Sequence, residues 1–324
     1  MLPLLSKIAA YVSGAPEIRI GVALGRNLLR ASILGKHDGT WQVARVQAVP
    51  VPVSLFEGEP SSATTQALAQ ALTSLLPEAV ENFVPLHLAV PGAVTSLRVF
   101  SLDTIPKAEK DRINLVRWRL AQELGVNYEL ACAYQIHEES QLQAGGVEGG
   151  GTLLGSAIDA RWLECLNEAC SAAHIVPTVI DGSFSSLFNH FHSEIKAFRE
   201  HSALICLEPE SWSLLVIDEQ ARVRLARSWW RDPGAGSAAA ADYDAIALEV
   251  EQAIRAYTLM DATPVKRVAI AGEGADISAL AVVLNQRMQQ PCHMLAVMQG
   301  GGANRMRPEY RGFSSALAAA FDFR

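Results

Sequence analysis

No stretch of about 18 or more consecutive apolar residues occurs in this 324-residue chain, so the sequence predicts no membrane-spanning helix. The chain also has no excess of positive charge: 27 Lys and Arg residues stand against 34 Asp and Glu residues, a net charge of −7. Because binding to nucleic acid requires a basic surface, nucleic acid is not expected as a partner.

The cysteines are too few and too scattered for a disulfide framework or a zinc site. Their number is odd, and no CxxC pair occurs among them. Buried thiols in a reducing cytosol are the simplest interpretation of such spacing, which predicts a cytoplasmic location. The five positions are Cys132, Cys165, Cys170, Cys206 and Cys292.

Residues 1–14, MLPLLSKIAAYVSG, form a separate N-terminal segment. A cleaved signal peptide is not favoured, because a basic start is missing and Lys7 interrupts the apolar stretch. Leu5, Ile8 and Val12 would share one face of a helix, which would dock on the protein or touch a membrane surface.

Hydrophobic periodicity predicts two copies of one arrangement, about 180 residues apart, in which three strands precede a helix and a further strand. Parallel pairing through helical crossovers places the fold in the α/β class. The first copy comprises strands at 17–24, 28–34, 41–49 and 84–90 and a helix at 61–76. The second comprises strands at 203–207, 212–218, 222–228 and 266–271 and helices at 242–260 and 276–289.

A different module lies between the two copies and is predicted to be an inserted α/β subdomain at 97–180. It contains strands at 97–102, 131–139, 152–159 and 176–181 and helices at 109–124 and 161–173. The glycine-rich run at 145–151 connects two strands, and no Lys-Ser/Thr pair follows it, so it is not a phosphate loop. The predicted lobes are then 15–96 with 181–200, and 201–324.

Five strings, taken in order, resemble the PilM family of type IV pilus inner-membrane assembly proteins. GVALGRNLLR at 21–30 is similar to the family's first phosphate hairpin, GIDIGSSSVK, and LICLE at 204–208 to its second, liDiG. LAVPGAVTSLRVFSLDTIP at 88–106 resembles the strand that leads into the insert, and IAGEGA at 270–275 the adenosine-side string. GFSSALAAAF at 312–321 resembles the closing helix, which returns to the first lobe.

This resemblance implies an actin-like two-lobed fold (actin/Hsp70/sugar-kinase class, close to FtsA) with a small insert in the first lobe. The family includes relatives that serve mannose-sensitive haemagglutinin pili. The resemblance also implies a nucleotide cleft. Its residues would be Gly21, Gly25, Arg26, Asn27, Gly272 and Gly274.

The cleft departs from the family pattern at the positions that would bind the metal, the attacking water and the phosphates. Ala23 and Cys206 stand in place of the two aspartates that serve Mg²⁺ and the attacking water, and Glu208 and Glu273 replace glycines. Alanine cannot bind a metal, a thiol suits a hard cation poorly, and Glu208 brings a side chain where phosphate should sit. We therefore expect a degenerate ATPase site with no catalytic residue, no metal and no required cofactor, although weak ATP binding without turnover stays open.

Simpler interpretations of several residues remain open. Arg26 and Asn27 suit an ordinary hairpin turn as well as an anion site, and Gly272 and Gly274 suit a plain strand-to-helix turn. One of Trp229 and Trp230 should enter a core, because neighbouring strand residues face opposite sides of a sheet.

An alternative function is a nucleotide-binding assembly ATPase of the same or a type II secretion apparatus, with Glu208 or Asp218 as replacement ligands. A sugar or acetate kinase would need a catalytic Asp that the cleft strings do not offer.

The function implied by the resemblance is a non-catalytic cytoplasmic scaffold, peripheral at the inner membrane through its partners. In the family, a groove between the first lobe and the insert accepts the cytoplasmic N-terminal segment of PilN, an inner-membrane partner. Self-association is also common among actin-like relatives. The residues predicted for partner binding are Arg98, Arg112, Arg117 and Trp118, whose mixture of cationic and aromatic character is enriched at interfaces. The alternative for this helix is a solvated face with one buried Trp.

Overall fold

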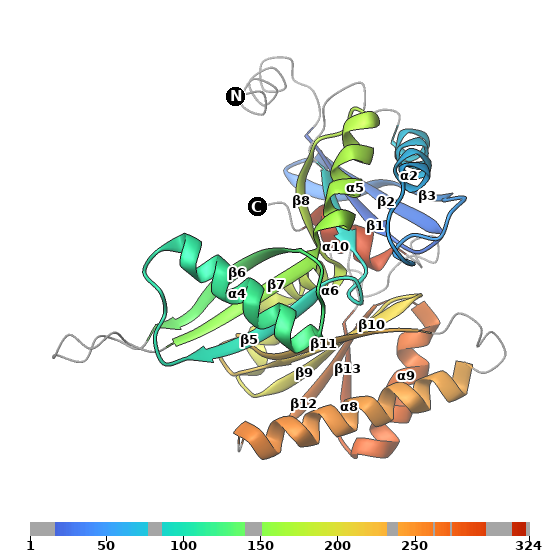
Figure 1. The fold of residues 1–324 in the computed structure, drawn as a ribbon. Helices are drawn as coiled ribbons and strands as arrows, with labels where there is room; N and C mark the ends of the chain where they lie inside the picture. Colours follow the sequence, from blue (N-terminus) through green and yellow to red (C-terminus); the bar gives the residue numbers. More distant parts are fainter. Residues whose placement is uncertain are drawn as a thin grey trace.

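The computed structural model describes seven stretches of the chain, which together carry both predicted lobes (Figure 1). The predicted N-terminal segment, residues 145–150 of the glycine-rich run and Glu273 lie outside them. None of the helices within these stretches has the length and apolar character needed to cross a membrane. The described stretches are 17–76, 86–139, 151–231, 239–261, 263–272, 274–295 and 313–321.

The first lobe is built on a five-stranded sheet. Its strands are β1 (Ile18–Leu24), β2 (Leu28–His37), β3 (Thr40–Pro50), β4 (Leu86–Val90) and β8 (Pro177–Gly182). They lie in the order β3-β2-β1-β4-β8. The first three form an antiparallel meander, whereas β4 runs parallel to β1 and β8 runs parallel to β4.

Two helices cover the outer face of this sheet, α2 (Ser62–Leu75) and α5 (Ala160–Ala172). α2 begins at Ser61, whose hydroxyl accepts the backbone N–H of Thr64 and so caps the helix at the residue that the sequence predicts. The apolar stripes of both helices pack on the inward side chains of the strands. These helix residues include Leu68, Ala71, Leu72, Leu166, Ala169 and Cys170.

The second lobe repeats the same sheet topology. Its strands are β9 (Ser202–Leu207), β10 (Ser211–Ile217), β11 (Val223–Trp230), β12 (Arg267–Gly272) and β13 (Cys292–Leu295), in the order β11-β10-β9-β12-β13. Helices α8 (Ala239–Asp261) and α9 (Gly274–Met288) cover one face. The recurrence that the sequence predicts is thus a repeat of the whole sheet.

Three helices belong to the inner faces of the two sheets: α6 (Ser183–His190), α7 (His192–Phe198) and α10 (Ser314–Phe321). Leu317 of α10 and Phe184 of α6 share one buried cluster with Leu204 of β9. α10 also packs against β1 and β4, as the resemblance implies for the closing helix. Because α6 and α10 pack on the first sheet and share a buried cluster with the second, they form the connection between the lobes (Figure 1).

The inserted subdomain is shorter than the sequence predicts. It consists of β5 (Ser96–Leu102), α4 (Glu109–Leu124), β6 (Leu130–Glu139) and β7 (Gly151–Asp159), with strand order β5-β7-β6. The predicted boundary at residue 180 is wrong, because β8 pairs with β4 and α5 packs beside α2 in the first lobe. The insert therefore ends at about Asp159, and α5 is the crossover that returns the chain to the first sheet.

Candidate functional site

The turn between β1 and β2 is the first of two hairpins that meet between the lobes. Gly25 closes it by donating its backbone N–H to Leu28 O at 2.9 Å. The following segment then reinforces it, because Leu55 N–H donates to Arg26 O at 2.7 Å and Val51 N–H to Asn27 O at 2.8 Å. Two of the turn's carbonyls are thus bound, and Asn27 itself is exposed.

The second hairpin joins β9 to β10 and is fixed by a single arginine. Glu208 N–H donates to Ser211 O at 2.9 Å, which closes the turn. Arg231 donates its backbone N–H to Glu210 O at 2.8 Å and its guanidinium to Glu208 O at 2.9 Å. An ion pair of 2.6 Å with Asp242 of α8 orients this guanidinium, so the second hairpin is held in one position relative to its own lobe.

The two hairpins contact each other through Glu210. Its carboxylate accepts the backbone N–H of Arg26 and so links the second lobe to the first. The Arg26 guanidinium lies over the ring of Trp230, 4.2 Å from its centroid, and forms an ion pair of 3.3 Å with Glu57. Arg26 therefore makes a charged hydrogen bond and a cation–π contact across the lobes at one point.

Glu208 makes a second set of links beside the first. Its side chain is buried, with 7% of the residue exposed. The carboxylate accepts the hydroxyls of Ser211 at 2.6 Å and Ser315 at 3.0 Å, and the backbone N–H of Gly92 at 3.4 Å. Gly92 and Ser315 belong to the crossover after β4 and to α10, so this buried charge is bound by donors from both lobes.

The two positions where the family carries aspartates are apolar in this chain. Ala23 packs in a small cluster with Ala89, Ala316 and Ala319. Cys206 belongs to β9, which lies between β10 and β12, and it is fully buried. Burial, with a smaller contribution from Glu208, raises the pKa of its thiol well above the ordinary range. The thiol is therefore neutral near pH 7, and neither residue offers an oxygen ligand to Mg²⁺.

Gly21 and Gly272, both predicted to line the cleft, are accounted for by packing. A Cβ atom on Gly21 would lie 2.1 Å from Ala316 O, so this glycine lets α10 approach β1. Gly272 has φ +151°, and a Cβ there would lie 2.0 Å from Leu207 O. Gly274 is the first residue of α9, and its surroundings lie outside the description.

Asp218, the other replacement ligand considered from the sequence, is far from the hairpins. It follows β10 at the end opposite to Ser211, in the turn to β11. Its carboxylate forms ion pairs with Arg222 at 2.8 Å and Arg224 at 3.0 Å. The prediction that Asp218 could serve a metal in the cleft is therefore wrong.

Three of the four residues predicted to bind a partner contact other parts of this chain. Arg98 donates to Ala226 O of β11 at 3.2 Å, and burial lowers the pKa of its guanidinium. Arg112 donates to the Tyr134 hydroxyl at 2.7 Å, and Arg117 to a backbone carbonyl of β6 at 3.2 Å. Their role toward a partner stays a prediction.

Trp118 differs from these arginines because it is 53% exposed on α4. The alternative of a buried Trp on this helix is wrong. The other tryptophan expectation is confirmed: Trp229 stacks on the buried Trp212, with ring centroids 4.0 Å apart, while Trp230 lies under Arg26.

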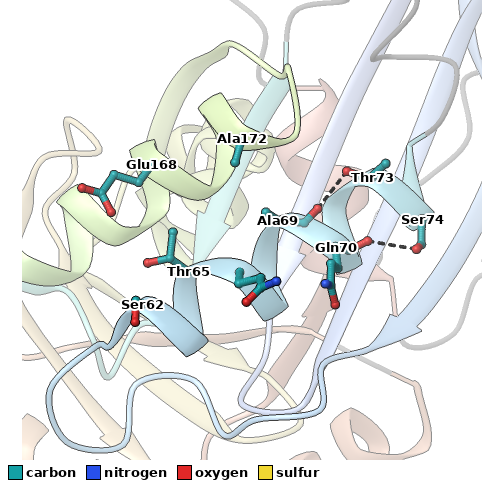
Figure 2. Close-up of a pocket in the computed structure, with 9 residues that line it drawn as sticks. Ser62, Thr65, Ala69, Gln70, Thr73, Ser74, Glu168 and Ala172 are labelled. Atoms are coloured by element: carbon teal, nitrogen blue, oxygen red, sulfur yellow. Dashed lines mark hydrogen bonds between the residues drawn. The ribbon is translucent and has the colours of Figure 1, made fainter.

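A surface hollow of about 620 Å³ lies on the outer face of the first lobe, between α2 and α5 (Figure 2). Small and polar side chains line it, and none belongs to the predicted cleft or partner residues. They are Ser62, Thr65, Gln66, Ala69, Gln70, Thr73, Ser74, Glu168 and Ala172. The hollow is thus separate from the contact between the hairpins.

Sequence reasoning missed the residues that complete this contact. The sequence predicts Glu208 where a phosphate should sit and Gly92 only near the partner groove, and it gives Glu210 and Ser315 no role. The available signal is the string Glu208-Pro209-Glu210, which places two acidic residues in the turn between two strands. A Mg–triphosphate does not fit these residues, because the Glu208 and Glu210 carboxylates already occupy the backbone donors and repel phosphate, and Ala23 and Cys206 offer no oxygen ligand.

Comparisons with known proteins identify the fold. No protein-family model matches the chain, and no curated protein matches it in sequence. The solved PilM–PilN type IV pilus biogenesis complex contains a chain that is 17% identical with a TM-score of 0.72, over 94% of this chain and 97% of that one. A Bacteroides thetaiotaomicron protein with an actin-like ATPase fold is 12% identical with a TM-score of 0.50, over 87% and 92%. The predicted actin-like fold is therefore confirmed.

Proposed function

We propose that this protein is a non-catalytic scaffold in the assembly of a type IV pilus or a related secretion apparatus. The observation that carries the proposal is the fold, which matches nearly all of a chain in the PilM–PilN complex. Support for the absence of catalysis comes from the hairpins, where Ala23 and Cys206 are buried among apolar neighbours. The proposal includes a mannose-sensitive haemagglutinin pilus, because relatives in the resembled family serve such pili.

The proposed partner is the cytoplasmic N-terminal segment of a PilN-like inner-membrane protein, which would hold the scaffold at the membrane surface. Edge strand β8 is the surface that we propose for it. β8 ends the first sheet, and Val176 and Val179 there are 67% and 41% exposed. An exposed apolar edge strand is prone to pair with another chain, and extended peptides are commonly bound by such strand addition.

Titration calorimetry with a peptide from the PilN-like protein of the same genome tests the partner. We expect saturable binding that the substitution Val179→Asp weakens at least about tenfold, because a charge on the edge disfavours pairing. The matched control is Val282→Asp, which places the same charge at a 55% exposed valine on α9 of the second lobe. Absence of binding, or equal loss in both variants, would contradict the proposal.

Phosphate release from Mg-ATP tests the absence of catalysis, with thermal shift as the companion measurement. We expect no phosphate release above the buffer rate, because Ala23 and Cys206 offer no oxygen ligand and the Glu208 carboxylate already accepts hydrogen bonds from Ser211, Ser315 and Gly92. Turnover that disappears with Glu208→Gln would instead favour the alternative, an assembly ATPase that uses Glu208 as a replacement ligand.

A further inference from the structure

Two carboxylates of the second lobe lie between the two hairpins, where the sequence resemblance implies a site for the phosphates of a nucleotide. Glu210 accepts the backbone N–H of Arg26 at the tip of the first hairpin. Glu208 accepts the backbone N–H of Gly92 and the hydroxyl of Ser315. Backbone N–H groups in tight turns are the donors that proteins commonly use to bind phosphate oxygens.

We propose that Glu208 and Glu210 are built-in substitutes for an anionic ligand and hold the two lobes together without nucleotide. The proposal goes beyond the scaffold function and does not rest on it, because it concerns only contacts within this chain. It also explains in physical terms why Mg-ATP does not fit this cleft. The backbone N–H and hydroxyl donors are present, but the Glu208 and Glu210 carboxylates of the same chain already accept their hydrogen bonds.

The surrounding contacts suit a permanent link. Arg231 fixes both ends of the Glu208–Glu210 turn through backbone carbonyls and is itself paired with Asp242. The backbone of the turn that carries both carboxylates is thus fixed by contacts within the second lobe. Gly92 provides the space for the second link, because a Cβ there would lie 2.2 Å from the Ser213 hydroxyl of β10.

Charge balance at this contact also favours carboxylates over a bound polyphosphate. The Arg26 guanidinium supplies a cation near this contact, but Glu57 already pairs with it and Trp230 lies beneath it. A triphosphate entering here would meet the negative charges of the buried Glu208 and the partly buried Glu210 at short range, and like charges repel most strongly where they are shielded from water. Removing the two carboxylates should therefore weaken the connection between the lobes at the hairpins and leave the donors free to bind an external anion.

Amide hydrogen exchange measured by mass spectrometry tests the link in the full chain. In the double variant Glu208→Ala/Glu210→Ala we expect exchange about 10- to 100-fold faster at residues 25–28 and 92–95, because charge-assisted hydrogen bonds to these turns are lost. Strand β4 should keep its protection. The matched control, Glu194→Ala/Glu249→Ala, removes the same charge at exposed positions and should leave exchange unchanged.

Inorganic pyrophosphate then tests whether the carboxylates stand in for phosphates. Added at millimolar concentration, it should restore protection at 25–28 and 92–95 in the double variant and change nothing in the wild type. Unchanged exchange in the double variant overturns the link. Faster exchange that pyrophosphate does not reverse overturns the claim that the carboxylates replace phosphate.

A measurement on the wild type keeps the proposal testable if the double variant loses protection throughout, including β4. Because the carboxylates already bind the donors, Mg-ATP at millimolar concentration should leave wild-type exchange at the hairpins unchanged. A clear slowing there on addition of Mg-ATP would overturn the proposal. None of these experiments involves a partner, so their failure is distinguishable from failure of the scaffold function.

Discussion

The backbone N–H of Arg26 donates a hydrogen bond to the carboxylate of Glu210, although 184 positions separate the two residues. The contact joins the tips of two hairpins that the repeated sheets present to each other. The repeat therefore brings two equivalent turns face to face, and the residues at their tips decide whether a ligand or the protein itself connects them.

Gly21 is the position where backbone packing should be most sensitive to substitution. In Gly21→Ala the new Cβ would lie 2.1 Å from Ala316 O, and α10 would have to move away from β1. The Ser32 hydroxyl, which donates to the same carbonyl at 2.9 Å, would lose its bond. We expect a loss of about 3 kcal/mol in the free energy of unfolding, measured by urea denaturation.

Gly35→Ala is the matched control for this substitution. Its Cβ would lie 3.9 Å from the Cβ of Ala44, an ordinary contact, so stability should change by less than about 1 kcal/mol. Equal effects in the two variants would show that glycine in these strands matters for some reason other than the approach of α10.

Restoring aspartates should not restore an ATPase. In the double variant Ala23→Asp/Cys206→Asp each carboxylate would replace a small buried side chain in an apolar cluster, at a cost of about 3 kcal/mol for each. Thermal denaturation should show the destabilisation, and phosphate release from Mg-ATP should stay at the background rate. Ala133→Asp, at an exposed position of β6, is the control and should be nearly neutral.

Local sequence patterns were sufficient for the elements but not for their grouping. Alternation of apolar residues predicts β1 to β3, and Ser61 marks the start of α2. Nothing local distinguishes α5 and β8 from the insert, because their place depends on pairing with β4 and packing on α2. For the same reason the sequence identified Ala23, Cys206 and Glu208, but not the donors that reach Glu208 from the other lobe.

Alkaline pH should destabilise the first lobe through Cys170. Burial raises the pKa of this thiol to about 12 from an ordinary value near 9. Between these values the unfolded chain loses the proton while the folded chain keeps it, so stability present below pH 9 falls as pH rises toward 12. The expected contribution to the slope is about −1.4 kcal/mol per pH unit, measured by urea unfolding from pH 8 to pH 11.

Cys170→Ala should remove this contribution and give a shallower slope. Ile175→Val trims the same core without removing a titratable group and should keep the wild-type slope. Identical slopes for Cys170→Ala and the wild type would mean that the Cys170 thiol does not control the alkaline limit.

Helix α4 should separate stability from partner binding, because its two faces differ so strongly. Leu120 is fully buried against β7 beside Gly155, whereas Trp118 is 53% exposed. Leu120→Ala should cost about 2–5 kcal/mol of stability, and Trp118→Ala should stay within about 0.5 kcal/mol of the wild type.

If the exposed face of α4 takes part in the proposed interface, Trp118→Ala should weaken binding of the PilN-like segment by about tenfold or more, since exposed aromatic residues are common binding hot spots. Calorimetry on the folded variant measures this directly, and unchanged affinity would confine the interface to the β8 edge, leaving the Trp118 side chain without a part in it.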